Sequence, residues 1–195
     1  MSTVKKVAFL GLGVMGFPMA GHLASKGFQV VVYNRSKEKS ERWLEKHNGS
    51  SALTPKEAAI GSDIVFACVG NDEDIRAVCL GQDGAFAGMN RGGVFVDHTT
   101  ASAQIARELF TFSKRLGLEF LDAPISGGQR GAEEGTLTVM CGGEDSTFRV
   151  AEPIISSYAQ SCELLGPSGS GQLTKMVNQI CIAGLLQGLS EALHF

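Results

Sequence analysis

The sequence predicts an α/β fold, in which a doubly wound, mainly parallel β-sheet carries helices on both faces. Apolar segments of strand length alternate with segments of helical periodicity over residues 1–165. A glycine-rich turn joins the first of these strands to the first helix. A long apolar helix follows a glycine-rich hinge near Gly166 and fills most of residues 166–195, so we expect a domain boundary at this hinge.

The first predicted unit is a strand, a glycine turn, a helix and a second strand. Val4–Leu10 is a continuous apolar run, which is typical of a strand buried on both faces. The G-x-G-x-x-G motif GLGVMG follows, then a helix at Val14–Lys26 and a strand at Phe28–Tyr33. This order predicts a Rossmann-type unit that holds the pyrophosphate of a dinucleotide at the turn and the helix N-terminus. The expected contacts are Gly11, Leu12, Gly13, Val14, Met15 and Gly16.

A secretory signal is the alternative for this stretch, because Lys5 and Lys6 precede its apolar run. A secretory signal requires a continuous apolar helix, and the glycines and Pro18 would break such a helix here. We therefore reject this alternative.

The rest of the first 165 residues continues the alternation of strands and helices. The further strands are predicted at Ile64–Val69, Val94–Asp97, Phe120–Asp122, Thr136–Cys141 and Ser161–Leu165. The further helices are predicted at Lys37–Lys46, Asp74–Cys79, Ala103–Leu116 and Thr147–Tyr158.

The final segment, Gln172–Phe195, is apolar around most of its circumference, which is typical of a buried helix. It is long enough to cross a bilayer, but polar residues from Lys175 to Glu191 interrupt it, so we expect no membrane span. We expect this helix to be covered by residues beyond the chain or by a partner chain.

The composition favours a globular, cytoplasmic protein. Hydrophobic residues make up 44% of the chain, which excludes a disordered class. The net charge is −3 without a basic tract, which argues against a nucleic-acid partner. The cysteines are odd in number and form no C-x-x-C pair, so we expect them to be reduced and buried. They are Cys68, Cys79, Cys141, Cys162 and Cys181. The scattered histidines predict no metal site.

The residues after the second strand indicate which dinucleotide is bound. An acidic residue usually stands there in NAD sites, where it holds the ribose 2′-hydroxyl. This chain has Asn34, Arg35 and Ser36 instead, and the planar guanidinium of Arg35 suits a 2′-phosphate. The sequence therefore favours NADP and leaves NAD open, with a solvated turn as the alternative. Ligands bind at the carboxyl ends of parallel strands, so further cofactor contacts are expected from Val69, Gly70 and Asn71.

Four spaced motifs resemble those of the β-hydroxyacid dehydrogenase family. They are GLGVMG at 11–16, DHTTAS at 97–102, DAPISGGQRGAEEGTLTVMCGG at 122–143 and GSGQLTKMVNQ at 169–179. The resemblance implies an NAD(P)-dependent enzyme that interconverts a small 3-hydroxy acid and its semialdehyde. It also implies a homo-oligomer and a long interdomain helix that begins an all-α C-terminal domain, most of which lies beyond this chain.

The resemblance also implies roles for single residues. Lys175 matches the family's catalytic lysine, which protonates the alkoxide left by hydride delivery and acts as the base in reverse. A surface lysine is the alternative, although the helix dipole disfavours a cation there. Asn178 or Gln179 shares the face of Lys175 and takes the substrate-amide role. The substrate side is completed by Thr100 near the nicotinamide and by a carboxylate cradle at Ser126, Gly127 and Gly128. A turn is the alternative for the cradle, and we interpret Asp97 as structural.

Three rival functions remain open. A 6-phosphogluconate dehydrogenase-like enzyme would share the architecture, but the pattern after Ser126-Gly127-Gly128 differs. Imine reductases usually lack the lysine that Lys175 supplies. A non-catalytic NADP-binding module would also lack it, and the chain has no basic arm for DNA.

Overall fold

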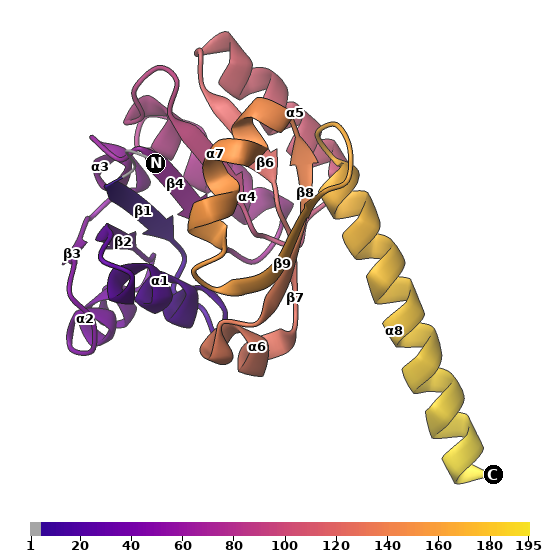
Figure 1. Cartoon of the computed structure of the whole chain (residues 1–195). Helices are drawn as coiled ribbons and strands as arrows, with labels where there is room; N and C mark the ends of the chain where they lie inside the picture. Colours follow the sequence, from indigo (N-terminus) through magenta and orange to yellow (C-terminus); the bar gives the residue numbers. More distant parts are fainter. Residues whose placement is uncertain (1–4) are drawn as a thin grey trace.

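The computed structural model describes residues 5–195 and confirms the α/β fold (Figure 1). The strands of the described residues are β1 (Lys6–Leu10), β2 (Gln29–Tyr33), β3 (Ser50–Ser51), β4 (Ile64–Ala67), β5 (Val94–Asp97), β6 (Glu119–Asp122), β7 (Ile125–Ser126), β8 (Leu137–Gly143) and β9 (Ala159–Leu164). They form a sheet in the order β3-β2-β1-β4-β5-β6-β8-β7, with β9 beside β8. Every pair from β3 to β6 in this order is parallel, whereas β8 is antiparallel to β6 and β7.

Helices cover both faces of this sheet. Buried side chains of α1 (Gly16–Ser25), α2 (Lys37–Leu44), α6 (Gly128–Glu134) and α7 (Asp145–Ile155) form one core. Those of α3 (Pro55–Ala59), α4 (Asp72–Cys79), α5 (Ala103–Arg115) and the 3₁₀ helix η1 (Ala85–Ala87) form the other. Strand β1 supplies both cores in turn, because successive side chains of a strand point to opposite faces. Val7 and Phe9 enter the first core, and Ala8 and Leu10 enter the second.

The predicted long elements are found within a few residues of their expected bounds, and five short elements were not predicted. The first strand begins at Lys6, and the predicted start at Val4 lies outside the described residues. Helix α7 ends at Ile155, so Tyr158, which was expected in the helix, instead precedes β9. The elements without a prediction are β3, α3, η1, β7 and α6. Each has seven residues or fewer, which is too short for a hydrophobic period to be recognised.

The last helix, α8 (Ser170–His194), extends away from the α/β body (Figure 1). Its buried residues are confined to its first two turns and are Gly171, Gln172 and Lys175. The remaining turns have no cover among the described residues, as expected for a helix that is covered from outside this chain, and Ile180 and Leu185 are each 71% exposed. No helix among the described residues has the length and apolar character needed to cross a membrane.

The cysteines agree only in part with the expectation that they are reduced and buried. All five are free thiols, as expected. Cys79 and Cys141 are buried, and Cys68 and Cys162 are partly buried. Cys181 is exposed, against expectation, because it lies on the projecting part of α8.

Candidate functional site

The turn between β1 and α1 depends on two glycines. Gly11 has φ +98°, and a Cβ there would lie 2.3 Å from the carbonyl oxygen of Cys68, which follows β4. A Cβ at Gly16 would lie 2.0 Å from the carbonyl oxygen of Gly11. Both contacts are shorter than any side chain allows, so only glycine closes this turn. A Cβ at Gly13 would meet no atom within 4 Å, so the middle of the turn faces open space.

That open space is a cleft of about 600 Å³ at the carboxyl ends of β1, β2 and β4. The strand order reverses between β1 and β4, and such a switch point is where ligands bind in doubly wound sheets. Ten of the residues predicted to contact the cofactor line this one cleft. They are Gly11, Gly13, Val14, Met15, Gly16, Asn34, Arg35, Ser36, Val69 and Gly70.

The three other predicted cofactor residues do not line this cleft. Leu12 is buried, and its N–H donates to Oδ1 of Asn34 at 2.9 Å. Asn71 caps α4, because its Oδ1 accepts the N–H of Asp74 at 2.9 Å. Thr100 is exposed in the loop that follows β5. Asn34 also donates to the carbonyl of Ser36 at 3.0 Å, so this amide ties the β1 turn to the β2 turn.

Arg35 has an anionic partner that the sequence did not reveal. Its side chain is 88% exposed, and its Nη1 lies 3.4 Å from Oδ1 of Asp74 in the first turn of α4. Asp74 and Lys39 line the same cleft as Arg35. The lining of the cleft therefore contains two cations, Arg35 and Lys39, and two carboxylates, Asp74 and Asp83.

Lys175 is nearly covered although it is a lysine. It lies in the second turn of α8 and is 7% exposed. Burial lowers the pKa of its amine below the ordinary value, because desolvation disfavours the charged form. Among residues 5–195, no carboxylate lies within 4 Å of this amine to form an ion pair. Asn178 is half-buried and Gln179 is exposed, so Asn178 follows the buried face of Lys175 more closely.

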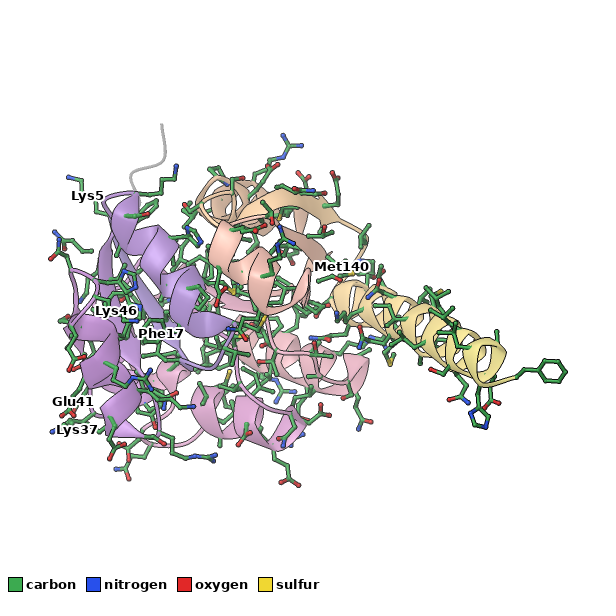
Figure 2. The ribbon with its side chains drawn as sticks, turned by 90° about the horizontal axis from the view of Figure 1, so that it is seen from below. Lys5, Phe17, Lys37, Glu41, Lys46 and Met140 are labelled. Carbon is green, nitrogen blue, oxygen red and sulfur yellow. The ribbon has the colours of Figure 1, made fainter. Side chains whose placement is uncertain are left out.

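The N-terminus of α8 is capped by a carboxylate from the sheet. The side chain of Asp122, at the end of β6, accepts the N–H groups of Gly169 at 2.7 Å and Gln172 at 3.1 Å. Asp122 is buried, and this desolvation raises the pKa of its carboxyl against the opposing effect of its hydrogen bonds. Figure 2 shows Met140 of β8 beside the same base of α8. The sequence does not predict this cap, because no local spacing joins Asp122 to α8.

Asp97 and His98, at and just after the end of β5, are buried titratable groups. Oδ1 of Asp97 accepts the N–H of Thr99 at 2.9 Å, while Oδ2 has no partner among the described residues. Burial raises the pKa of Asp97 to about 7. Nδ1 of His98 donates to the Ala123 carbonyl at 2.6 Å, so Nε2 accepts from the Tyr158 hydroxyl at 2.8 Å. Burial lowers the pKa of His98 to about 4.

The predicted carboxylate cradle lies at the start of α6. Ser126 ends β7, which is paired with β8, and Gly127 and Gly128 follow with φ of +130° and +63°. A Cβ at Gly128 would meet no atom within 4 Å, so this backbone is open to a ligand. These residues lie outside the lining of the cofactor cleft, as do Thr100, Lys175, Asn178 and Gln179.

Comparison with known proteins gives one family match. Residues 6–166 match the family described as the NAD binding domain of 6-phosphogluconate dehydrogenase. The match includes every strand that the structure describes and the whole lining of the cofactor cleft.

Single proteins match over nearly all of this chain. It is 60% identical to an uncharacterized oxidoreductase of Shewanella frigidimarina, covering 97% of this chain and 65% of that protein. It is 37% identical to the probable 3-hydroxyisobutyrate dehydrogenase-like 2, mitochondrial, of Arabidopsis thaliana, covering 97% and 63%. The structure of Mycobacterium tuberculosis 3-hydroxyisobutyrate dehydrogenase with L-serine matches with a TM-score of 0.91 at 31% identity, covering 97% and 64%. The chain thus spans less than two thirds of each of these proteins.

Proposed function

Because this chain belongs to the β-hydroxyacid dehydrogenase family of oxidoreductases, with an NAD-binding domain of the 6-phosphogluconate dehydrogenase type, we propose that it reversibly reduces a small semialdehyde to a 3-hydroxy acid. The observation that carries this proposal is the buried Lys175, whose pKa is lowered by desolvation and which pairs with no carboxylate among residues 5–195. A structural lysine would keep its charge in solvent or in an ion pair, whereas an acid–base catalyst needs a pKa nearer the working pH.

Lys175 is the general acid of the proposed reduction. Reduction of an aldehyde carbon leaves negative charge on the former carbonyl oxygen, and the Lys175 ammonium donates its proton to that oxygen. In the reverse direction the neutral amine accepts the hydroxyl proton of the 3-hydroxy acid. The nicotinamide, when bound, supplies or accepts the hydride. Asn178 lies one turn beyond Lys175 and is the better placed of the two candidate amides.

The proposed substrate is a small acid with its carboxylate on Ser126, Gly127 and Gly128. A hydroxyl and backbone N–H groups suit a carboxylate, and Gly128 leaves room for it. L-Serine, present with the M. tuberculosis enzyme, is itself a 3-hydroxy acid. Thr100 is the proposed contact between the nicotinamide and the substrate.

The proposed cofactor is NADP. Ten of the residues that the sequence predicts to contact the cofactor line one cleft at the switch point of the sheet. The turn at Gly13 leaves open space for the proposed pyrophosphate. Arg35 and Lys39 supply positive charge for a 2′-phosphate, with Asn34 and Ser36 as neutral donors. We also propose a domain boundary near Gly166, a homo-oligomeric state and a cytoplasmic location.

Substitution of Lys175 tests the reaction. In the full-length protein, Lys175→Ala should lower kcat about 10²–10⁴-fold, because the alkoxide loses its proton donor. Steady-state assays with semialdehyde and NADPH measure this change. Cofactor affinity should stay unchanged, because Lys175 lies outside the lining of the cleft. Lys175→Arg should not restore activity, because guanidinium does not release its proton near neutral pH.

Retention of most of the kcat by Lys175→Ala at saturating substrate would show that the proposed mechanism is wrong. The substrate panel comprises glyoxylate, succinic semialdehyde, tartronate semialdehyde and methylmalonate semialdehyde, with 6-phosphogluconate for the rival activity. Cofactor binding without turnover across this panel would favour the non-catalytic module.

A further inference from the structure

The side chain of Gln172 joins α8 to the loop that follows β5. Gln172 is fully buried. Its Nε2 donates to the carbonyl of Thr99 at 2.7 Å, and its Oε1 accepts the N–H of Ala101 at 3.1 Å. One primary amide thus satisfies a donor and an acceptor of the same loop backbone. Neither a carboxylate nor an apolar side chain makes both bonds.

The same loop is joined to the cofactor cleft. The hydroxyl oxygen of Thr99 accepts the N–H of Val69 at 3.1 Å, and Val69 lines the cleft. Thr99 is itself fully buried, so this bond is sheltered from water. A continuous set of hydrogen bonds therefore runs from the wall of the cleft through Thr99 to Gln172.

The backbone of Gln172 is held from a second side. Its N–H donates to Oδ2 of Asp122, and Oδ1 of the same carboxyl accepts the N–H of Gly169. Asp122 lies opposite Asp97 in the register of β5 and β6, so both anchors of Gln172 come from neighbouring strand ends. Lys175 follows three residues later, on the same face of α8.

We propose that Gln172 is a positioning residue, which fixes the amine of Lys175 relative to the cofactor cleft through its two bonds to the Thr99–Ala101 backbone. This inference rests on the proposed function of Lys175. The cleft and α8 belong to different parts of the fold, and among residues 5–195 the side chain of Gln172 is the one that hydrogen-bonds the loop after β5 to α8. A displacement of about 1 Å at a catalytic group can cost about 100-fold in rate, so a rigid link here has a large effect.

Two substitutions at position 172 test the link. Gln172→Met keeps the length but makes neither bond. Gln172→Glu keeps the acceptor for Ala101 and loses the donor to Thr99 until the carboxyl is protonated. The buried carboxyls of Asp97 and Asp122 stand at the neighbouring strand ends and favour that protonation. Ser113→Ala is the matched control, because Ser113 is fully buried and donates to Phe110 within α5, away from both sites.

The expected effect is a fall in kcat of about tenfold to 100-fold for Gln172→Met, with cofactor affinity and KM unchanged. The ratio of the kcat of Gln172→Glu to that of the unsubstituted protein should rise as the pH is lowered, because the protonated carboxyl donates to the carbonyl of Thr99. Gln172→Met should show no such recovery, and Ser113→Ala should keep the original kcat.

A second measurement needs no turnover. Competitive acetylation followed by mass spectrometry gives the titration midpoint of Lys175 in each variant. Loss of the link should move this midpoint upward, toward that of a solvated lysine, for Gln172→Met but not for Ser113→Ala. An active Lys175→Ala variant would overturn the proposed function alone. An unchanged midpoint together with an unchanged kcat in Gln172→Met would overturn the positioning role.

Discussion

In the proposed NADP complex, the Arg35 guanidinium would have two competing anionic partners, the 2′-phosphate and Asp74. In this structure its guanidinium lies beside Asp74, and the pair is largely exposed. Exposed ion pairs are weak, so we expect the 2′-phosphate of the proposed cofactor to displace this carboxylate with little loss of free energy. Asp74 should nevertheless repel that phosphate, so we expect the two residues to have opposite effects on the choice between NADP and NAD.

Substitution of either member of the Arg35–Asp74 pair should change the preference between the two dinucleotides. Arg35→Ala should weaken NADPH binding about tenfold or more and spare NADH, because only NADPH carries the 2′-phosphate. Asp74→Asn should strengthen NADPH binding a few-fold and change NADH little. Fluorescence titration of both dinucleotides measures the ratio, with Glu73→Gln in the same turn of α4 as the charge-matched control. Equal losses for both dinucleotides in Arg35→Ala would contradict the assignment.

Asp97 yields a prediction about stability and pH. Its pKa is about 7 in the folded chain and 3.8 in the unfolded chain. The folded state therefore binds this proton more tightly, and the resulting stability is complete below pH 3.8 and lost as the pH rises through 7. Relative to Asp97→Asn, the original chain should gain up to about 4 kcal/mol of unfolding free energy between pH 7 and pH 4.

Urea denaturation of both chains across this range measures the difference. The comparison between the two chains removes the opposing effect of His98, whose pKa of about 4 makes acid destabilising in both. A difference independent of pH would show that Asp97 is ionised in the folded state.

At the scale of elements, the turn between β1 and α1 separates two roles of glycine. Gly13→Ala should leave the unfolding free energy nearly unchanged, because its Cβ meets nothing within 4 Å, and should weaken cofactor binding. Gly16→Ala should lower stability by several kcal/mol, because its Cβ would lie 2.0 Å from the Gly11 carbonyl. Thermal unfolding with and without NADPH distinguishes them. Equal stability of the two variants would show that the turn relaxes around a methyl group.

Elements with a strong hydrophobic period could be predicted from the sequence. The alternation of Val7 to Leu10 between two cores, and the continuous burial of β4 and β5, follow from their apolar runs. The two-residue strands β3 and β7 could not be predicted, because their identity comes from pairing partners far along the chain. Helix α6 begins at glycines with positive φ, and its sequence therefore indicates a turn.

Those residues of the candidate site that belong to a local sequence motif could be predicted. The residues of the glycine turn and the β2 end line one cleft, as their positions at strand ends require. The bonds from Asp122 and Gln172 could not be predicted, because they join residues separated by at least 47 positions. Long-range partners of this kind depend on the order of strands in the sheet, and the hydrophobic pattern does not specify that order.

At the scale of the whole molecule, α8 predicts association. Its exposed apolar side chains include Ile180, Leu185 and Leu189, which are 71%, 71% and 52% exposed. Contiguous apolar surface of this kind binds partners, so the 195-residue chain should sediment as concentration-dependent oligomers. Leu185→Ser with Leu189→Ser should shift it toward monomer, whereas Val150→Ser on α7 should not. A monodisperse monomer at all concentrations would contradict this prediction.

Helix α8 is held only at its N-terminal end among the described residues, so a small rotation there displaces the other end by a larger distance. About 19 residues separate Lys175 from His194, which corresponds to about 28 Å of helix at about 1.5 Å per residue. A tilt of about 5° at the base therefore moves the far end by about 2–3 Å. The hydrogen bonds to Asp122, Thr99 and Ala101 set the direction of the helix axis. A small change in the angle that they fix therefore becomes a larger displacement of the C-terminal end of α8.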